Sequence, residues 1–285
     1  MEPFVIDQAE RLSAPVRPTT RRETRLTASP SGLPSRRILD MRVDATTYAG
    51  ATDIIVDWAA RGESRYVCVA TVHMVMEAYD DPAYRDIVNA ADLVTSDGMP
   101  LVWGLRMLGL RSATRVYGPD LTPIVCERAA RDGIPVGFYG SSEAVLSDMV
   151  GALQAAYPAL QVAYRHSPPF RELSDTEIED ELQALRDSGA RIIFVGLGCP
   201  KQERWMQARR GEVDAVMLGV GAAFDYVAGS KAQAPDWIQS LGLEWLFRMV
   251  TEPRRLWRRY LYNNPRFVAH FGAQLVRTYL KKEQA

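Results

Sequence analysis

Residues Arg191-Ile-Ile-Phe-Val195 lead into the turn Gly196-Leu-Gly-Cys-Pro200 and then into the amphipathic segment Lys201–Arg210. Four consecutive apolar residues bounded by turn signals predict a strand buried on both faces. The glycine-bearing turn and the helical period after it predict a helix that follows this strand directly. A strand–turn–helix unit of this kind is typical of an α/β protein with a parallel sheet.

The same unit recurs along the chain from about Arg37. Continuous apolar runs separated by helical segments predict a Rossmann-like, mostly parallel sheet with helices on both faces. The predicted strands are Tyr66–Thr71, Ala91–Thr95, Pro135–Tyr139, Leu160–Tyr164, Arg191–Val195 and Asp214–Val220. The predicted helices are Pro100–Leu108, Leu121–Arg131, Ser142–Tyr157, Ser174–Ser188 and Lys201–Arg210.

Several predicted helices carry end signals. Ser142 and Ser174 stand where an N-cap is wanted, and Glu177, three residues after Ser174, completes a capping-box pattern. Gly133 and Gly189 follow two helices at the position that favours a left-handed backbone. These signals support the predicted helix ends.

Composition limits the class of protein. The chain has 285 residues, of which 47% are hydrophobic and 24% charged, which predicts a packed core and excludes disorder throughout. No apolar run approaches the roughly 18 residues of a membrane-spanning helix, and no signal-peptide pattern follows Met1. Cys68, Cys126 and Cys199 form no CxxC pair, so we expect reduced thiols and a cytoplasmic location.

Charge is segregated along the chain, although the net charge is only −1. Arg11–Arg37 carries a net +6 and Arg248–Lys282 a net +8, so the rest of the chain is strongly acidic. Aromatic residues interleave with the second basic block, which favours an anionic membrane surface over merely solvated charge, and no nucleic-acid motif is present. We expect a flexible basic tail over 1–36, an α/β core over 37–243 and a C-terminal helical basic appendage over 244–285.

Ligands of parallel α/β sheets bind outside the carboxyl ends of the strands, so the residues after each strand form the candidate site. Thr71 and His73 follow one predicted strand, and Asp97 follows the next. Asp97 is suited to accept a proton, with helix capping as its alternative role, whereas His73 has the alternative of a hydrogen-bonded core histidine. Glycine-bearing turns follow later strands, where backbone N–H groups favour phosphate unless the turn is an ordinary connection. These turns contain Gly140, Ser141, Gly196 and Gly198, and Lys201 and Gln202 open the next helix.

The sequence lacks several common motifs for nucleotide and metal binding. The turn at Gly196 lacks the third glycine of GxGxxG, which disfavours a nucleotide-dependent oxidoreductase, and no GxxxxGK[ST] phosphate loop occurs. Three histidines, with no HExxH, DxD or Cys/His ligand spacing, predict that no metal is bound.

Several motifs taken together resemble those of the WecG/TagA/CpsF glycosyltransferases, over roughly Arg37 to Arg266. The run Gly196–Trp205 is similar to the signature GxGxPKQExW of that family. The other matching stretches are Ala91–Gly98, Arg115–Gly118, Gly219–Asp225 with Ala228-Gly229, Ala234–Trp237, and Glu244–Arg248 with Glu252-Pro253-Arg254. The sequence departs from the family at His73, where asparagine is frequent, and at Gln233, where a basic residue is frequent.

The resemblance implies an inverting glycosyltransferase of the hexosyltransferase class. It implies transfer of an N-acetylmannosamine-, mannosaminuronate- or glucose-type sugar from a UDP-sugar to a polyprenyl-diphosphate-linked saccharide, without a metal cofactor. This step belongs to cell-surface polysaccharide synthesis, such as exopolysaccharide biosynthesis, by a peripheral protein on the cytoplasmic face of the bacterial inner membrane. In the resemblance, Asp97 is the general base and Thr71, Arg115 and Gln202 surround it.

The resemblance also places three arginines, Arg248, Arg255 and Arg258, in an appendage that closes over the site. Their spacing allows one shared helical face, although Pro253 requires a kink or a break between the first and the others. Guanidinium groups suit diphosphate oxygens, and glycine-turn N–H groups add to them.

Three further contacts complete the expected site. Lys201 either binds donor phosphate or is a solvated residue of the first helical turn. Tyr139 and Asp225 are expected to flank the nucleobase, and His73 the acceptor.

Two other classes stay open at this stage. One is a non-catalytic, membrane-associated protein that binds a nucleotide sugar, and the other is a different nucleotide-dependent α/β enzyme. Turnover of a labelled donor separates the first of these from the enzyme. A homo-oligomer also stays open.

Overall fold

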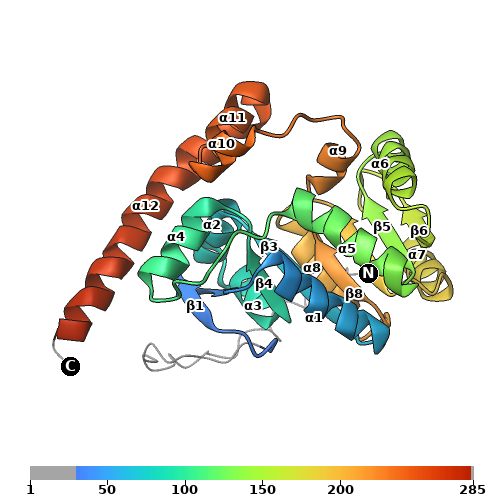
Figure 1. Ribbon diagram of the computed structural model, residues 1–285, viewed down its shortest axis with the longest axis horizontal. Helices are drawn as coiled ribbons and strands as arrows, with labels where there is room; N and C mark the ends of the chain where they lie inside the picture. Colours follow the sequence, from blue (N-terminus) through green and yellow to red (C-terminus); the bar gives the residue numbers. More distant parts are fainter. Residues whose placement is uncertain (1–29, 284–285) are drawn as a thin grey trace, which may run out of the picture.

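A six-stranded, all-parallel sheet forms the centre of the molecule, and helices cover both of its faces (Figure 1). The computed structural model describes residues 30–283, and the strands lie in the order β4-β3-β8-β7-β5-β6. The strands of the sheet are β3 (Arg65–Ala70), β4 (Leu93–Ser96), β5 (Val136–Gly140), β6 (Val162–His166), β7 (Ile192–Gly196) and β8 (Val216–Gly219). All six predicted strands are therefore confirmed, each with ends shifted by no more than four residues.

The helices alternate with these strands as predicted. The five predicted helices are α4 (Met99–Met107), α5 (Gly118–Asp132), α6 (Glu143–Ala156), α7 (Asp175–Asp187) and α8 (Lys201–Arg209). The sequence analysis missed α1 (Tyr48–Ala60), α2 (Val72–Asp80), α3 (Pro82–Ala90), α9 (Ala223–Val227) and α10 (Asp236–Ser240).

Alternation of side chains across the sheet explains why both faces need cover. In β7, Ile193 and Val195 belong to one hydrophobic core, while Phe194 belongs to the other. The buried ring of Phe138 on the neighbouring strand stacks on Phe194, with ring centroids 5.2 Å apart. Strands buried on both faces follow from the continuous apolar runs in the sequence.

The helix-end signals are confirmed at the atomic level. The Ser174 hydroxyl accepts a hydrogen bond from the Glu177 N–H at 3.3 Å, and the Glu177 carboxylate accepts one from the Ser174 N–H at 2.9 Å. Ser142 caps α6, and Gly133 and Gly189 both have φ of +69°. The caps satisfy backbone groups that the helix itself leaves unpaired.

An antiparallel hairpin precedes the sheet and was not predicted. It joins β1 (Ser35–Ile38) to β2 (Met41–Asp44) through Leu39 and Asp40, whose φ values are +49° and +67°. Two left-handed residues match the tight turn that the twist of a hairpin favours. Because β1 begins at Ser35, the expected boundary between tail and core at 36/37 lies inside a strand. The rest of the expected tail, residues 1–29, lies outside the described residues.

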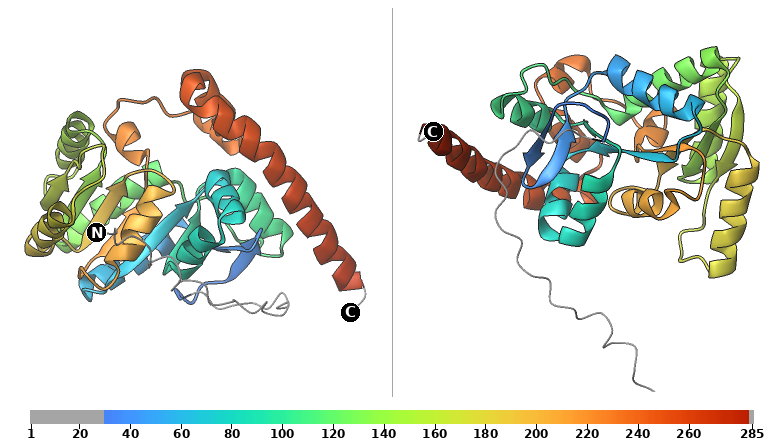
Figure 2. Two further views of the ribbon diagram at one scale, coloured as in Figure 1. Left: turned by 180° about the vertical axis from the view of Figure 1, so that it is seen from behind. Right: turned by 90° about the horizontal axis from the view of Figure 1, so that it is seen from below.

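The C-terminal appendage is helical, as expected. It contains α11 (Glu244–Thr251) and α12 (Pro253–Glu283), so a break before Pro253 separates the two helices. Figure 2 shows α12 running along one side of the body, and it packs against α2 and the hairpin. The guanidinium of Arg266 donates to both carboxylate oxygens of Asp80 at 2.6 and 2.8 Å. Within residues 30–283, no helix combines the length and the apolar character that crossing a bilayer requires.

Candidate active site

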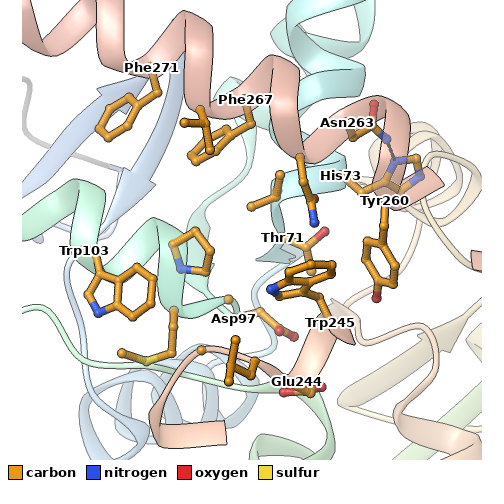
Figure 3. A pocket seen from close by; sticks show the side chains of 18 of the residues that line it. Thr71, His73, Asp97, Trp103, Glu244, Trp245, Tyr260, Asn263, Phe267 and Phe271 are labelled. Atoms are coloured by element: carbon orange, nitrogen blue, oxygen red, sulfur yellow. Dashed lines mark hydrogen bonds between the residues drawn. The ribbon is translucent and has the colours of Figure 1, made fainter. Parts of the chain in front are cut away.

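A cavity of about 510 Å³ lies between the carboxyl ends of β3 and β4 on one side and the C-terminal helices on the other (Figure 3). Thr71, His73, Asp97 and Arg115 line it from the core, and residues of α10, α11 and α12 close it. The site therefore unites segments more than 100 residues apart in sequence, and the appendage forms one of its walls.

Asp97 lies in the middle of this cavity. Its backbone N–H donates to the Ala70 carbonyl at 2.9 Å, which fixes the residue directly beyond the sheet, and its Oδ2 accepts from the Gly118 N–H at 3.3 Å. Burial, opposed by the charge of Arg115 and reinforced by Glu244, raises the pKa of Asp97 to about 7. A carboxylate with a pKa near neutrality suits a general base. The alternative role for Asp97 is wrong, because α4 begins after Gly98 and has no side-chain cap.

Arg115 is held in place by three acceptors. Its Nε donates to the Asp97 carbonyl at 2.6 Å, one terminal nitrogen donates to Gln239 at 2.7 Å, and the other pairs with Glu244. Its guanidinium carbon lies 4.0 Å from the centre of the Tyr117 ring, which adds a cation–π contact. Although burial opposes the charged form, Asp97 and Glu244 raise the pKa of Arg115. The positive charge beside Asp97 is therefore permanent.

Thr71 and His73 form the wall opposite Glu244. Thr71 is the N-cap of α2, and its hydroxyl accepts from the Met74 N–H at 3.4 Å. The Nδ1 atom of His73 lies 3.2 Å from the side-chain nitrogen of Asn263 on α12, as Figure 3 shows. Burial, with the charge of Arg259, lowers the pKa of His73 to about 3, so the ring is neutral. His73 is therefore hydrogen-bonded and also lines the cavity, and its contact with the acceptor stays a prediction.

The structure separates the three arginines expected in the appendage. Arg248 lines the cavity, but Arg255 and Arg258 do not: Arg255 pairs with Glu252 at 2.5 Å, and Arg258 lies over the exposed Trp257 ring. The expected shared face does not form, because the break before Pro253 changes the direction of the chain. Arg259, which the sequence analysis did not select, lines the cavity instead.

Arg248 and Arg259 give the cavity unbalanced positive charge. The Nε atom of each is buried and has no hydrogen-bond partner within residues 30–283. Burial lowers the pKa of Arg259, whereas the pKa of Arg248 is raised despite burial, through the neighbouring tyrosines and Glu244. Buried donors without partners are costly, so these two arginines favour an anionic ligand.

The glycine turns gather at a second place, along the ends of β5 and β7, and do not line this cavity. A Cβ atom built on Gly140, whose φ is +120°, would lie 2.7 Å from the carbonyl carbon of Gly196. Ser141 also has a left-handed backbone, with φ of +62°, and Gly198 has φ of +78°. The side chain of Lys201 is exposed at the start of α8.

Two expected contact residues are buried away from the cavity. Gln202 is 4% exposed; its side-chain oxygen accepts from the Gly198 N–H at 3.2 Å and its amide donates to Glu203 at 2.8 Å. Gln202 therefore holds the Gly198 turn in place. Tyr139 stacks on Trp205 at 4.4 Å and donates to Glu181 at 2.6 Å, so its ring is not presented to a nucleobase. Asp225 pairs with Lys231 at 3.0 Å.

Many of the lining residues that sequence reasoning missed come from α12. Starting at Arg259, every fourth residue of the helix lines the cavity, and this four-residue step was the available signal. Glu244 was quoted only as part of a motif. The missed lining residues are Trp103, Gln239, Glu244, Tyr260, Asn263, Phe267, Phe271 and Leu275, with Arg259.

In the part of the chain that the structure describes, His, Cys, Asp and Glu side chains form no group of three that could hold a metal ion. The charged groups that face the cavity centre are Asp97 and Glu244 against Arg115, Arg248 and Arg259.

A parallel sheet that presents one carboxylate of near-neutral pKa in a cavity with two arginines, whose Nε atoms have no hydrogen-bond partner within residues 30–283, is typical of a group-transfer enzyme. The chain belongs to the WecG/TagA/CpsF family of glycosyl transferases, whose family model matches residues 36–281. It is 26% identical over 227 residues to an N-acetylglucosaminyldiphosphoundecaprenol N-acetyl-beta-D-mannosaminyltransferase of Bacillus spizizenii, which covers 79% of this chain and 86% of the relative. The resemblance in the sequence motifs, the α/β fold and the assignment as a glycosyltransferase are thereby confirmed.

Proposed function

We propose that this glycosyltransferase moves a sugar, with inversion, from a UDP-sugar to a polyprenyl-diphosphate-linked saccharide in cell-surface polysaccharide synthesis. The donor is of the N-acetylmannosamine, mannosaminuronate or glucose type. The main support for this proposal is the position of Asp97, a carboxylate of near-neutral pKa in a cavity with buried arginines. The name of the Bacillus relative, which specifies an undecaprenol diphosphate acceptor, supports the choice of acceptor.

In the proposed transfer step one bond forms, one bond breaks and one proton moves. The acceptor hydroxyl oxygen attacks the anomeric carbon of the donor and forms the new glycosidic bond, while the bond from that carbon to the diphosphate oxygen breaks. Asp97 takes the hydroxyl proton, and UDP leaves with the bonding electrons. The side chain of Arg115 donates a hydrogen bond to the backbone carbonyl of Asp97 and so helps to fix the position of Asp97 in the cavity.

Negative charge develops on the departing diphosphate and needs stabilisation. The positive end of the α5 dipole lies beside Asp97, and Arg115 and Arg248 supply permanent positive charge. We propose that these groups replace a metal ion, so that transfer needs no cofactor. Addition of a chelator should then leave the rate unchanged.

The donor nucleotide is proposed to extend toward the ends of β5 and β7. The turns there contain Gly140, Ser141, Gly196 and Gly198; a Cβ on Gly198 would meet no atom within 4 Å, and Lys201 is exposed nearby. Asp225 fits this end through its position after β8. Small residues that allow a ligand to approach the backbone are typical of nucleotide sites.

The appendage is also proposed to bind the cytoplasmic face of the bacterial inner membrane. Arginines alternate along α12 with exposed apolar and aromatic residues, a combination that favours the headgroup region of anionic lipids. The exposed residues are Trp257, Leu261, Tyr262, Val276, Tyr279 and Leu280. Sedimentation with anionic vesicles, compared with neutral ones, tests this part of the proposal.

Mass spectrometry of reaction products tests the proposed activity. The protein is incubated with a panel of UDP-sugars and a short polyprenyl-diphosphate-N-acetylglucosamine, and the mass of the lipid product identifies the sugar transferred. A product longer by one sugar supports the proposal. A protein that binds donors but releases no UDP and extends no acceptor would instead be a non-catalytic nucleotide-sugar-binding protein.

A further inference from the structure

One half of the cavity is apolar. On the side of α4 it is lined by Trp103 and Met107, and on the side of α12 by Phe267, Phe271 and Leu275. Figure 3 shows the Trp103 ring facing Phe267 and Phe271 across an open space, with Asp97 at one end of that space. We call this half the α4–α12 groove.

The groove changes in polarity along α12. Arg259 and Asn263 line the cavity near Asp97, and Phe267, Phe271 and Leu275 continue the same side of the helix at four-residue steps. The apolar stretch from residue 267 to residue 275 is about 12 Å long on the helix axis, so it has room for the first part of a hydrocarbon chain. The cavity therefore matches an amphiphile with an anionic head and an apolar chain.

Several apolar side chains of the groove are exposed to solvent, and a bound ligand would cover them. Trp103 is 41% exposed, Met107 44% and Val268 69%, and all three line the cavity. Apolar area that leaves water on ligand binding contributes favourably in proportion to its size. The positive charge of Arg248 and Arg259 adjoins this apolar area in the same cavity, so the head and the chain have complementary partners.

We propose that the α4–α12 groove binds the first isoprene units of the lipid acceptor, with its diphosphate against Arg259. This inference rests on the proposed function and adds a subsite for the hydrocarbon chain. In it the protein recognises the lipid directly and does not depend only on the membrane to concentrate the acceptor.

Gly272 offers a variant that closes the groove without damaging the fold. It lies inside α12, lines the cavity, and a Cβ built on it meets no atom within 4 Å. Gly272→Leu therefore places a side chain in free space, and leucine favours a helix more than glycine does. Gly151→Leu is the matched control, because Gly151 is an exposed glycine inside α6 with equally free space.

Binding is measured first, with geranylgeranyl diphosphate and with inorganic diphosphate, by calorimetry below the aggregation concentration of the lipid. The wild-type protein should bind the lipid at least about 10-fold more tightly than the inorganic ion, since burial of even one five-carbon unit contributes this much. Gly272→Leu should remove most of that difference, whereas Gly151→Leu should keep it. Equal binding of the two ligands by the wild type, or an unchanged difference in Gly272→Leu, would overturn the proposal.

Turnover measurements then distinguish a failure of the groove proposal from a failure of the proposed function. Two acceptors carry the same N-acetylglucosaminyl diphosphate head, one on a four-isoprene chain and one on an ethyl group, in buffer without membranes. Gly272→Leu should raise KM for the long acceptor by at least about 10-fold and leave the ethyl acceptor unchanged. Failure of both acceptors with every donor would contradict the proposed function, while the binding result would still decide whether the groove holds a hydrocarbon chain.

Discussion

The two ends of the sheet's carboxyl edge are built in different ways. At β3 and β4 the site consists of side chains, among them Asp97 and Arg115, and α10–α12 close over them. At β5 and β7 it consists of backbone, because Gly140 and Gly196 lie too close together for any side chain. The difference teaches that side chains at the first end can be exchanged one by one to test their proposed roles. At the second end the turns are packed tightly, so a substitution there acts first on the fold.

The largest expected effect concerns Asp97. Asp97→Asn should lower kcat by about 100-fold or more, because the acceptor proton then has no carboxylate to accept it. Donor affinity, measured by calorimetry with a UDP-sugar, should stay within about twofold, since the amide keeps the shape of the side chain. Asp132→Asn, at the exposed end of α5, serves as the control. Retention of half the activity in Asp97→Asn would contradict the assignment of the base.

Arginines of the appendage provide the next test. Arg248→Ala and Arg259→Ala should each lower kcat/KM by about 100-fold, the usual scale for losing a charged group that stabilises the transition state. Arg255→Ala and Arg258→Ala should lie within about twofold of the wild type, because an exposed ion pair and an exposed cation–π contact contribute little. The opposite ranking would mean that α12 docks differently in the active enzyme.

Glycine substitutions test the backbone end of the comparison. Gly140→Ala should lower the free energy of unfolding by about 2 kcal/mol or more, since it forces a side chain into a left-handed backbone and against Gly196. Gly198→Ala should cost about 1 kcal/mol, because its Cβ meets no atom within 4 Å and only the backbone conformation is strained. Urea denaturation measures both, and equal losses would show that the contact with Gly196 is unimportant.

The smallest expected effect is a shift in pH dependence. Asp97 must be ionised to act, so kcat/KM should rise with pH through a midpoint near 7, its folded-state pKa. Glu244 contributes to raising that pKa, so Glu244→Gln should move the midpoint to lower pH. Glu252→Gln is the control, because Glu252 pairs with Lys231 and Arg255 outside the catalytic group. A midpoint that does not move would remove Glu244 from the electrostatics of the base.

Much of the sheet was predictable because its strands are buried on both faces. Continuous apolar runs such as Ile192–Val195, separated by helical segments, are typical of parallel strands that helices cover on both faces. The hairpin at β1 and β2 was missed, because its turn uses Leu39 and Asp40 in place of the glycine or asparagine that marks such turns. Helices α2 and α3 were missed because they follow their strand and each other almost without a loop.

The candidate site was predictable where its residues lie next to a strand. Thr71, His73 and Asp97 were selected because they follow strands, Arg115 was selected through the motif resemblance, and the structure brings all four into one cavity. Tyr139 and Gln202 also follow that logic, yet their side chains turn inward and bond to Glu181 and Glu203. The sequence pattern does not tell whether a side chain at the end of a strand or the start of a helix points inward or toward the site. For Tyr139 and Gln202, the packing of α7 and α8 decides the direction.

The sequence by itself determined the parallel sheet, the edge of the sheet where the candidate site lies, and the family, because these follow from local apolar patterns and from motifs at strand ends. Only the tertiary structure decided which arginines face Asp97 and that α4 and α12 form an apolar groove. The physical reason is the break before Pro253: the direction of a helix after a break depends on the surface it packs against. That surface is assembled from α2, α4 and the hairpin, which no local pattern in α12 records.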